Sequence, residues 1–292
     1  MTLTILAQQA VNGIVLGSLY VLVALGLTLI YGVLVQINFA HADFVTLGAF
    51  AAYFFMHLSG GSYPAAIAAA LVVGGVLGFL VNVAIFAPLR HKSELLPLIA
   101  TIGVSVMLEN AMLAVFGPVP YAFETPYSAV FRFAGIFLSA QNAIIIAVST
   151  VTIVALYCFM RFTFLGKALR AVAQDRETAG LMGINPNYLI MLTFVLASAL
   201  AGMGGAMLAP VLVLTPFAGA SVIVKAFAIV IIGGFGNVEG TILAGVIVGL
   251  IESFTTQYLD PGLIDIVVFG LLLAMLAFRP TGLISERREE NV

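Results

Sequence analysis

The sequence predicts an all-α, polytopic integral membrane protein with about 8–10 transmembrane helices. Only 8% of its residues are charged and 62% are hydrophobic, whereas a soluble domain has about 25% charged residues. Residues 1–42 and 44–89 contain no Asp, Glu, Lys or Arg, and a helix needs about 20 apolar residues to cross a bilayer. These runs lack the alternation of barrel strands, so helices are the expected spanning elements.

The chain divides into nine apolar segments separated by glycine, proline or charged residues. The predicted membrane segments are residues 7–34, 44–58, 64–86, 95–116, 139–160, 188–208, 220–232, 241–254 and 263–278. The second and eighth segments follow polar breaks and are short, so full spans and re-entrant segments both stay open for them. Two pairs of glycines lie four residues apart: Gly13 and Gly17, and Gly245 and Gly249. Such pairs are predicted to admit close helix neighbours.

Basic residues set the expected orientation, because cytoplasmic loops carry an excess of Lys and Arg. Residues 1–292 are predicted to form a single transmembrane domain with a cytoplasmic segment at 161–187 and a cytoplasmic tail at 279–292. With the N-terminus outside and the C-terminus inside, nine of the eleven basic residues fall on the cytoplasmic side. Arg132 falls outside, and Lys225 is expected near a helix end, from which it snorkels outward. The first segment lacks a basic start and a cleavage site, so we expect it to be retained.

The sequence carries none of the motifs expected of an enzyme or of a nucleotide-binding chain. The glycine-rich stretch at 233–240 is not followed by Lys-Ser or Lys-Thr, so it is not a phosphate loop. His41 and Asp43 are too few for a metal site, which needs about three or four ligands. The net charge of −2 gives no general basic surface for nucleic acid, and Cys158, as the single cysteine, excludes an intrachain disulfide. We therefore predict no catalytic residue, metal or cofactor in this chain.

The most ordered polar stretch is residues 161–187, which interrupts the apolar sequence with six charged residues. Gly166 is expected to open a first short helix. Asp175 is expected to cap a second short helix, which Gly183 ends. Asn185, followed by proline, then starts the next long helix. Two capped helices between two spans indicate a compact handle for another protein. The alternative is an ordinary loop whose charges only set the topology.

Polar residues at membrane depth are costly and mark candidate positions in a transport pathway. The candidates are Asn38, His41, Asp43, Glu109, Asn110, Gly234, Gly236 and Asn237. For the first three, the alternative is a place at the cytoplasmic surface, where solvation makes them ordinary. For Glu109, a pathway role and a buried hydrogen bond are equally open. Glu252 is expected to form a buried hydrogen bond, with Asn110 or Gln257 as partner, or to lie near the outer interface.

The segment LGKALRAVAQDRETAGLMGINPNYLIMLTF resembles the coupling segment of ABC importer permeases of the branched-chain amino acid class, and is closer to the LivH type than to the LivM type. The resemblance extends over essentially the whole chain, through NGIVLGSLYVLVALGLTLIYGVLVQINFAHADFVTLGAF and VIIGGFGNVEGTILAGVIVGLIE. In that family this segment docks into a groove of the cytoplasmic ATPase. The resemblance implies that the coupling residues are Gly166, Arg170, Ala171, Asp175, Glu177, Ala179, Gly183 and Asn185.

The same resemblance implies a permease subunit in the inner membrane of a bacterial or archaeal cell, which moves branched-chain amino acids by alternating access. Its implied partners are a second homologous permease of the LivM type, two cytoplasmic ATPases that bind and hydrolyse ATP, and an external substrate-binding protein. Three alternatives stay open. They are a permease of the same family for urea or short amides, an ion-coupled secondary transporter that uses Glu109, Asp43 or Glu252, and a passive solute channel.

Overall fold

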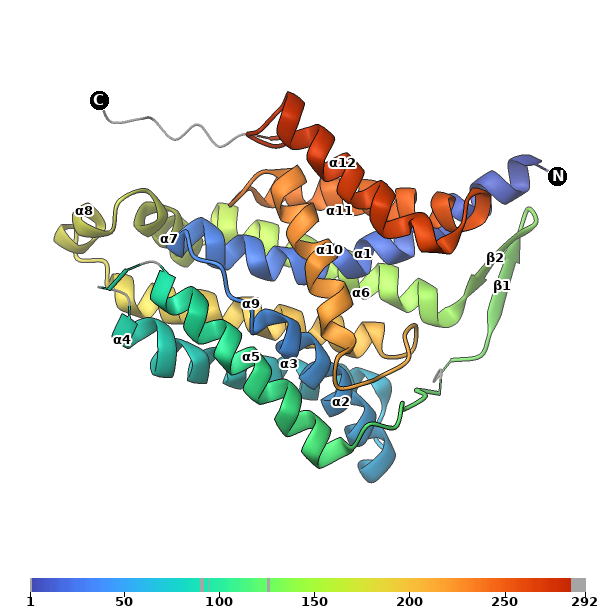
Figure 1. Ribbon diagram of the computed structural model, residues 1–292, viewed down its shortest axis with the longest axis horizontal. Coiled ribbons are helices and arrows are strands. Elements are labelled where there is room, and N and C mark those ends of the chain that lie inside the picture. Colours follow the sequence, from blue (N-terminus) through green and yellow to red (C-terminus); the bar gives the residue numbers. More distant parts are fainter. Residues whose placement is uncertain (1, 90–91, 94, 125–126, 285–292) are drawn as a thin grey trace.

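Twelve α-helices and one short β-hairpin make up the described part of the chain, which confirms the all-α class (Figure 1). The computed structural model describes residues 2–89, 92–93, 95–124 and 127–284. The helices are α1 (Thr2–Leu34), α2 (His41–Ser59), α3 (Tyr63–Val81), α4 (Ala87–Leu89), α5 (Leu95–Phe116), α6 (Ala140–Phe162), α7 (Phe164–Gln174), α8 (Arg176–Leu181), α9 (Pro186–Leu208), α10 (Ala218–Gly233), α11 (Val238–Tyr258) and α12 (Ile264–Phe278). The strands are β1 (Val130–Phe133) and β2 (Ile136–Ser139). A π-helical turn (Asn82–Phe86) precedes α4, and a 3₁₀ turn (Pro261–Leu263) precedes α12.

Eight of the described helices are long and apolar enough to cross a membrane. They include α2 and α11, which follow the two polar breaks. The remaining predicted segment, residues 220–232, corresponds to α10, which has 16 residues. A helix of that length rises about 24 Å, which is less than the hydrocarbon thickness of about 30 Å. The architecture is therefore that of a polytopic membrane protein with one short internal helix.

Both ends of α10 find partners inside the protein, which explains how so short a helix is tolerated. At its start, the backbone N–H of Gly219 donates to Thr46 Oγ1 at 2.9 Å. At its end, the N–H of Leu283 donates to the carbonyl of Ile232 at 2.8 Å. Such partners are needed because lipid offers none to the polar groups of the backbone.

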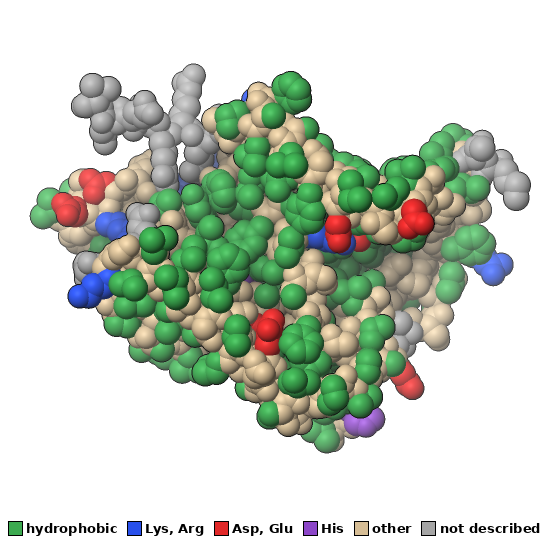
Figure 2. Space-filling model, viewed as in Figure 1, with side chains coloured by type: hydrophobic (Ala, Val, Ile, Leu, Met, Phe, Trp, Pro, Cys, Tyr) green, Lys and Arg blue, Asp and Glu red, His purple; other side chains and the backbone are tan. Residues whose placement is uncertain are grey.

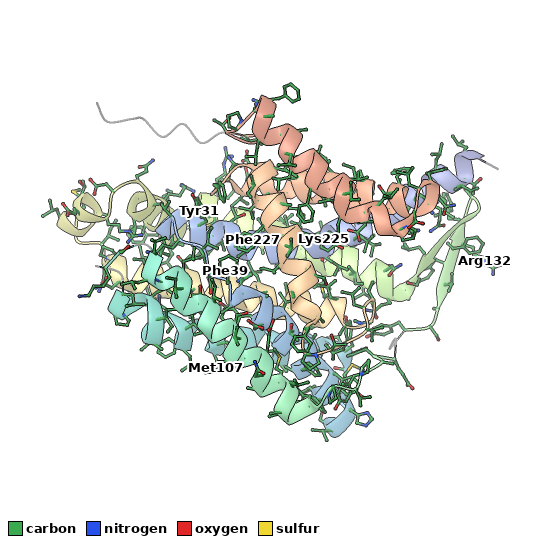
Figure 3. All side chains as sticks on the ribbon, viewed as in Figure 1. Tyr31, Phe39, Met107, Arg132, Lys225 and Phe227 are labelled. Carbon is green, nitrogen blue, oxygen red and sulfur yellow. The ribbon has the colours of Figure 1, made fainter. Side chains whose placement is uncertain are left out.

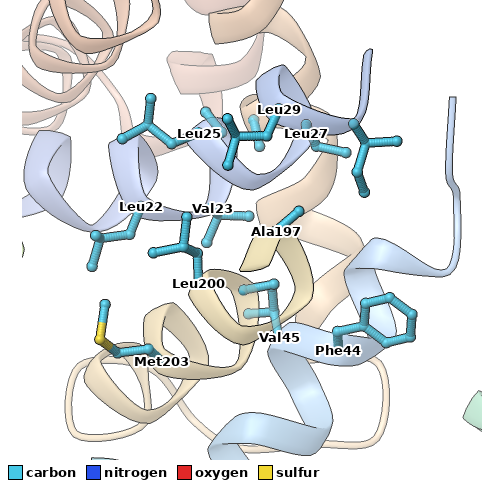
Figure 4. Close-up of a cluster of buried hydrophobic side chains, with 14 of the residues drawn as sticks. Leu22, Val23, Leu25, Leu27, Leu29, Phe44, Val45, Ala197, Leu200 and Met203 are labelled. Carbon is cyan, nitrogen blue, oxygen red and sulfur yellow. The ribbon is translucent and has the colours of Figure 1, made fainter. Parts of the chain in front are cut away.

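Two helices, α1 and α9, form the core of the bundle. In their membrane-spanning windows 89% and 78% of the residues are buried, against 11% in α5 and 6% in α12. Side chains from α1, α2 and α9, among them Leu22, Phe44 and Leu200, meet in this core (Figure 4). The two predicted glycine pairs face each other, because a Cβ atom on Gly17 would lie 2.9 Å from the Cα atom of Val246. The helices α1 and α11 therefore pack backbone to backbone, as predicted.

The chain alternates between two ends of the bundle. The helices α7 and α8 lie at one end, and the N-terminus and the hairpin lie at the other (Figure 1). Arg176 hydrogen-bonds the carbonyl of Val33 near the end of α1, whereas Gln8, near its start, hydrogen-bonds β2. The described basic residues other than Arg132 and Lys225 lie toward the α7–α8 end, which is therefore the expected cytoplasmic end. Part of the predicted cytoplasmic charge lies outside the described residues: Arg90, Arg287 and Arg288, with residues 285–292 of the tail.

Residues 117–138, which join two of the predicted membrane segments, contain most of a β-hairpin. The strands β1 and β2 pair antiparallel and end with Phe133 opposite Ile136. The two turn residues have positive φ values, 49° at Ala134 and 83° at Gly135. Two successive positive φ values match the twist of the flanking strands, which is why such turns are favoured in hairpins.

Candidate coupling site and polar residues at membrane depth

A sharp turn at Thr163 joins α6 to α7. The Oγ1 atom of Thr163 accepts a hydrogen bond from the N–H of Gly166 at 3.0 Å and caps α7. The helix begins at Phe164, two residues before the predicted start at Gly166. Gly166 instead lets α7 pack on the end of α6, because a Cβ atom there would lie 2.3 Å from the carbonyl oxygen of Phe159.

Asp175 caps the start of α8, as predicted. Its Oδ1 atom accepts hydrogen bonds from the N–H groups of Glu177 at 2.9 Å and Thr178 at 3.1 Å. Its other carboxylate oxygen accepts from the Thr178 hydroxyl. The Thr178 hydroxyl and N–H lower the pKa of Asp175 below its ordinary value, because their hydrogen bonds favour the charged carboxylate.

We expect the order of α8 to depend on pH in one direction. A carboxyl group with a lowered pKa stabilises the folded state above its unfolded pKa, and that contribution is lost as the pH falls through the folded pKa. Amide-exchange protection factors in α8 should therefore be constant above the ordinary Asp pKa of about 3.9 and fall below it. Asp175→Asn keeps a capping oxygen but does not titrate. The same acid dependence in Asp175→Asn would contradict the assignment.

Gly183 ends α8 in the left-handed region, as predicted. Its φ is 82°, and the N–H of Ile184 donates to the carbonyl of Ala179 at 3.1 Å. This bond provides a partner for one of the carbonyls that the end of a helix leaves unpaired. Gly180 differs, since it lies within α8 and a Cβ atom there would meet open space.

The two glycines provide a matched pair of substitutions. Gly183→Ala should destabilise the end of α8 by about 1 kcal/mol, because L-residues are strained at this φ. Gly180→Ala should stabilise α8 by about 0.5–1 kcal/mol, because alanine loses less backbone entropy in a helix. Protection factors in α8 measure both changes. Effects of equal size and sign would contradict the assigned role of Gly183.

Asn185 caps α9, and Pro186 occupies its first turn, as predicted. The Oδ1 atom of Asn185 accepts from the N–H groups of Asn187 at 3.1 Å and Tyr188 at 3.2 Å. The 161–187 segment is therefore fixed by a side-chain cap at the start of each of α7, α8 and α9. A segment fixed in this way is able to transmit a push to the helices at its two ends.

Two arginines fasten this segment to the membrane helices. Arg170 Nη1 donates to the carbonyl of Met160 in the last turn of α6. Arg176 Nη2 donates to the carbonyl of Val33 in the last turn of α1 at 3.1 Å. A cation is favoured at a helix C-terminus, where carbonyls lack partners and the helix dipole is negative. Arg170, a predicted coupling residue, thus holds α7 against α6.

The tip of α8 exposes two large apolar side chains. Leu181 is 88% exposed and Met182 is 79% exposed, and α8 lies at the extreme end of the molecule in Figure 1. Apolar side chains exposed together on a protein surface mark a candidate site for contact with another protein. Neither residue was among the predicted coupling residues. The sequence signal was present as an apolar pair between two glycines, GLMG, within a polar segment.

The other predicted coupling residues divide between the surface and the interior. Glu177 is exposed, and Ala171 is half-buried. Ala168 and Ala179 are buried against the chain itself. These two alanines therefore face the protein itself and leave no room for a partner. Their small size instead lets α7 and α8 pack closely on their neighbours.

The 161–187 segment, the end of α1 and the break between α10 and α11 border an open recess of about 1150 Å³. Arg170 lines this recess together with Gly236 and Asn237, so predicted coupling and pathway residues meet there. At its edge, Arg161 Nη1 lies 3.9 Å from Glu239 Oε1. So long and exposed an ion pair adds little to stability. The recess therefore separates α7 from the break between α10 and α11.

The break between α10 and α11 is a broken helix, as predicted. Gly234 has a φ of 104°, and a Cβ atom there would lie 2.5 Å from the carbonyl oxygen of Ile284. Gly236 also has a positive φ, 80°. Asn237 Oδ1 accepts from the N–H of Gly240 at 2.7 Å and caps α11. In this conformation these residues end one helix and start the next.

The three candidate polar residues at the break between α1 and α2 are buried, which contradicts their interpretation as solvated groups at the cytoplasmic surface. Asn38, His41 and Asp43 are all buried, and α2 already begins at His41. The ring of His41 fits over Gly26, where a Cβ atom would lie 2.7 Å from it. His41 Nε2 lies 3.2 Å from the carbonyl oxygen of Val23. His41 is therefore buried against α1, where Gly26 leaves room for its ring and Val23 offers a carbonyl oxygen.

Glu109 lies near Asp43, across the contact between α5 and α2. The Asp43 carboxylate interacts with Ser105 and Glu109 of α5. Glu109 is half-buried, whereas Asn110 is exposed and its amide donates to the carbonyl of Val106 at 2.7 Å. Asn110 is therefore not the partner of Glu252. A charge at membrane depth costs about 2.5–3.5 kcal/mol on insertion scales, so these groups need protein or water beside them.

Lys225 and Glu252 form an ion pair at membrane depth (Figure 3 labels Lys225). Lys225 Nζ lies 2.8 Å from Glu252 Oε1 and 3.3 Å from the hydroxyl of Tyr20. The prediction that Lys225 snorkels is wrong, because it lies midway along α10. Glu252 is hydrogen-bonded and buried, as expected, but not to Gln257, which pairs with Gln9 at 2.8 Å. Pairing across α1, α10 and α11 avoids an isolated charge in lipid.

Comparison with known proteins covers nearly the whole chain. The family model described as "Branched-chain amino acid transport system / permease component" matches residues 9–276. The permease protein BraD of a high-affinity branched-chain amino acid transport system, from Pseudomonas aeruginosa, is 34% identical, with 98% of this chain and 97% of BraD aligned. The corresponding LivH of Escherichia coli K12 is 32% identical over the same shares of the two chains. LivM of that strain is 22% identical over 94% of this chain and 70% of its own. No solved structure matches significantly.

Proposed function

Because the chain belongs to the family of permease components of branched-chain amino acid transport systems, we propose that it is the transmembrane permease subunit of an ATP-driven importer of branched-chain amino acids. We further propose that the chain lies in the inner membrane of a bacterial or archaeal cell. The observation that carries the proposal is the 161–187 segment. Its two capped helices lie at the expected cytoplasmic end and present Leu181 and Met182 to a partner.

The proposed partners are the other subunits that an ATP-driven importer needs, and the relatives of this chain support one of them. Two cytoplasmic ATPases bind and hydrolyse ATP, and one of them receives the tip of α8 in an apolar groove. A second, homologous permease completes the membrane part. Relatives named LivM, which align with 93% and 94% of this chain, support such a pair. An external binding protein delivers the amino acid.

Force enters at α8 and passes to two membrane helices, α1 and α6. Arg176 links the segment to α1, and Arg170 links α7 to α6. The recess beside α7 reaches the break between α10 and α11, where Arg161 stands 3.9 Å from Glu239. Closure of the ATPases therefore pushes α7 toward this break. The helices on either side of the break then switch the pathway from outward-open to inward-open by a hinge motion.

Reconstitution separates this function from its alternatives. The four-subunit complex in liposomes, with ATP on the ATPase side and binding protein on the other, should accumulate labelled leucine. The chain alone, given a proton or sodium gradient, should not concentrate it. Neutralising Asp43 and Glu109 should leave uptake dependent on ATP. Gradient-driven accumulation by the chain alone would contradict the proposal and favour a secondary transporter.

A further inference from the structure

Three helices border an open face of the molecule. The helices α5 and α12 are splayed apart, and α10 crosses between them (Figure 1). The exposed residues of α10 form a narrow stripe of Ala220, Ser221 and Val224, and Phe217 is exposed just before the helix. Figure 2 shows this mostly apolar face interrupted at its centre by acidic and basic side chains. Figure 3 places Lys225 in this central region.

The Lys225–Glu252 pair brings charge to the middle of this face. Lys225 is midway along α10, directly beside the exposed Val224. The side chains of the pair keep 14% and 11% of their surface exposed. Lipid chains offer no hydrogen-bonding partner, and charged groups at membrane depth face protein or water. This part of the face is therefore unsuited to lipid and suited to a polar pathway.

The pair leaves one donor and one acceptor unused. A lysine ammonium has three N–H donors, and Lys225 directs two of them to Glu252 and Tyr20 within the described part of the chain. The Oε2 atom of Glu252 is buried and has no hydrogen-bond partner among the described residues. An unmet buried polar group is destabilising, so the free Oε2 atom of Glu252 would gain from a ligand that offers it a hydrogen-bond donor.

We infer that Lys225 and Glu252 form a substrate subsite for the zwitterionic head of an α-amino acid. This inference rests on the proposed function and specifies its substrate class. Lys225 takes the carboxylate and Glu252 takes the ammonium group. A zwitterion replaces each member of the pair by an equivalent charge, so the pair opens without leaving either charge alone.

The surroundings of the pair select for an apolar side chain. Val224 is exposed next to Lys225, and Phe227 lies one turn further along the same face of α10. Both offer apolar surface beside the charged pair. Urea and short amides carry no charges and gain nothing from separating the two ions. The subsite therefore favours branched-chain amino acids over uncharged amides.

The first test measures leucine uptake by the complete ATP-driven complex with Lys225→Met, Glu252→Gln, or the double exchange Lys225→Glu with Glu252→Lys. Each single variant should lower uptake by about 100-fold, because one charge of the ligand loses its partner. The double exchange keeps an ion pair and should therefore give more assembled complex than either single variant. It should not restore uptake, because the bound amino acid would be reversed and its side chain would point away from Val224. Recovery of uptake together with yield would overturn the inference and assign the pair a structural role only.

The second test leaves the pair intact, so it still decides the question if the single variants fail to fold. In a Cys158→Ser background, Val224→Cys in the ATP-free complex should react with a hydrophilic thiol reagent. Excess leucine should slow the reaction about tenfold, whereas urea should not. Leu273→Cys, on the exposed side of α12, serves as the lipid-facing control and should not react. Absence of reaction at Val224→Cys, or indifference to leucine, would overturn the inference.

Wild-type uptake separates failure of this inference from failure of the proposed function. If the wild-type complex does not accumulate leucine with ATP, the proposed function fails and the subsite fails with it. If the wild-type complex transports leucine and the double exchange also does, only the subsite fails.

Discussion

Replacing both Leu181 and Met182 with aspartate is expected to reduce ATP-driven leucine uptake by about 100-fold or more, since a buried interface anchor contributes about 2 kcal/mol or more. These side chains are 88% and 79% exposed at the tip of α8. In the proposed complex they enter an apolar groove of the ATPase. Aspartates at the same positions would have to lose their hydration there without a partner.

Co-purification of the ATPase measures this effect directly, alongside uptake. The matched control replaces another adjacent apolar pair, Leu212 and Val213, with aspartate. These residues are exposed in the loop after α9, at the end opposite α8. The control should retain the ATPase. Undiminished recovery of the ATPase with the tip variant would show that α8 is not the docking element.

A second large effect is expected from Gly205→Val, which should prevent the bundle from folding. A Cβ atom on Gly205, in α9, would lie 1.9 Å from the carbonyl oxygen of Val45, in α2. Ordinary overpacking costs about 1–3 kcal/mol. Here the obstacle is backbone, which cannot rotate away as a side chain can. Native proteins are stable by only about 5–15 kcal/mol. Forcing α2 away from the central helix α9 is therefore expected to cost enough stability to prevent folding.

Gly103→Val is the matched control. Gly103 lies in α5, where a Cβ atom would meet nothing within 4 Å. The Gly103→Val variant should match the wild type in yield and in thermal unfolding temperature in detergent. Gly205→Val should give little monodisperse protein. Similar yields for the two variants would mean that α2 and α9 do not touch backbone to backbone.

Features fixed by short-range chemistry were predictable from the sequence. The caps at Asp175 and Asn185 and the terminating Gly183 depend on residues within a few positions, and all three were predicted correctly. The spacing of the two glycine pairs predicted close helix neighbours for α1 and α11, but not that the two pairs would face each other. The hairpin was not predicted, although its turn, Ala134-Gly135, stands between two short stretches rich in β-branched and aromatic residues.

Features fixed by long-range packing were not predictable. Lys225 and Glu252 lie on different helices, and Tyr20, the third member of their cluster, is 205 residues before Lys225. Nothing near Lys225 in the sequence distinguishes a snorkelling lysine from a paired one. His41 is buried because Gly26 makes room for it, and that contact depends on how α1 and α2 cross. The candidate pathway residues thus needed the fold before their surroundings could be described.

The most direct test determines on which side of the membrane α8 lies and whether the ATPase covers it. Thr178 is exposed in α8, and Thr178→Cys in a Cys158→Ser background provides a single thiol there. A membrane-impermeant maleimide should label this thiol in inside-out vesicles but not in intact cells, and added ATPase should block the labelling. Labelling from outside the cell, or labelling unaffected by the ATPase, would contradict the claim that α8 is the cytoplasmic docking element.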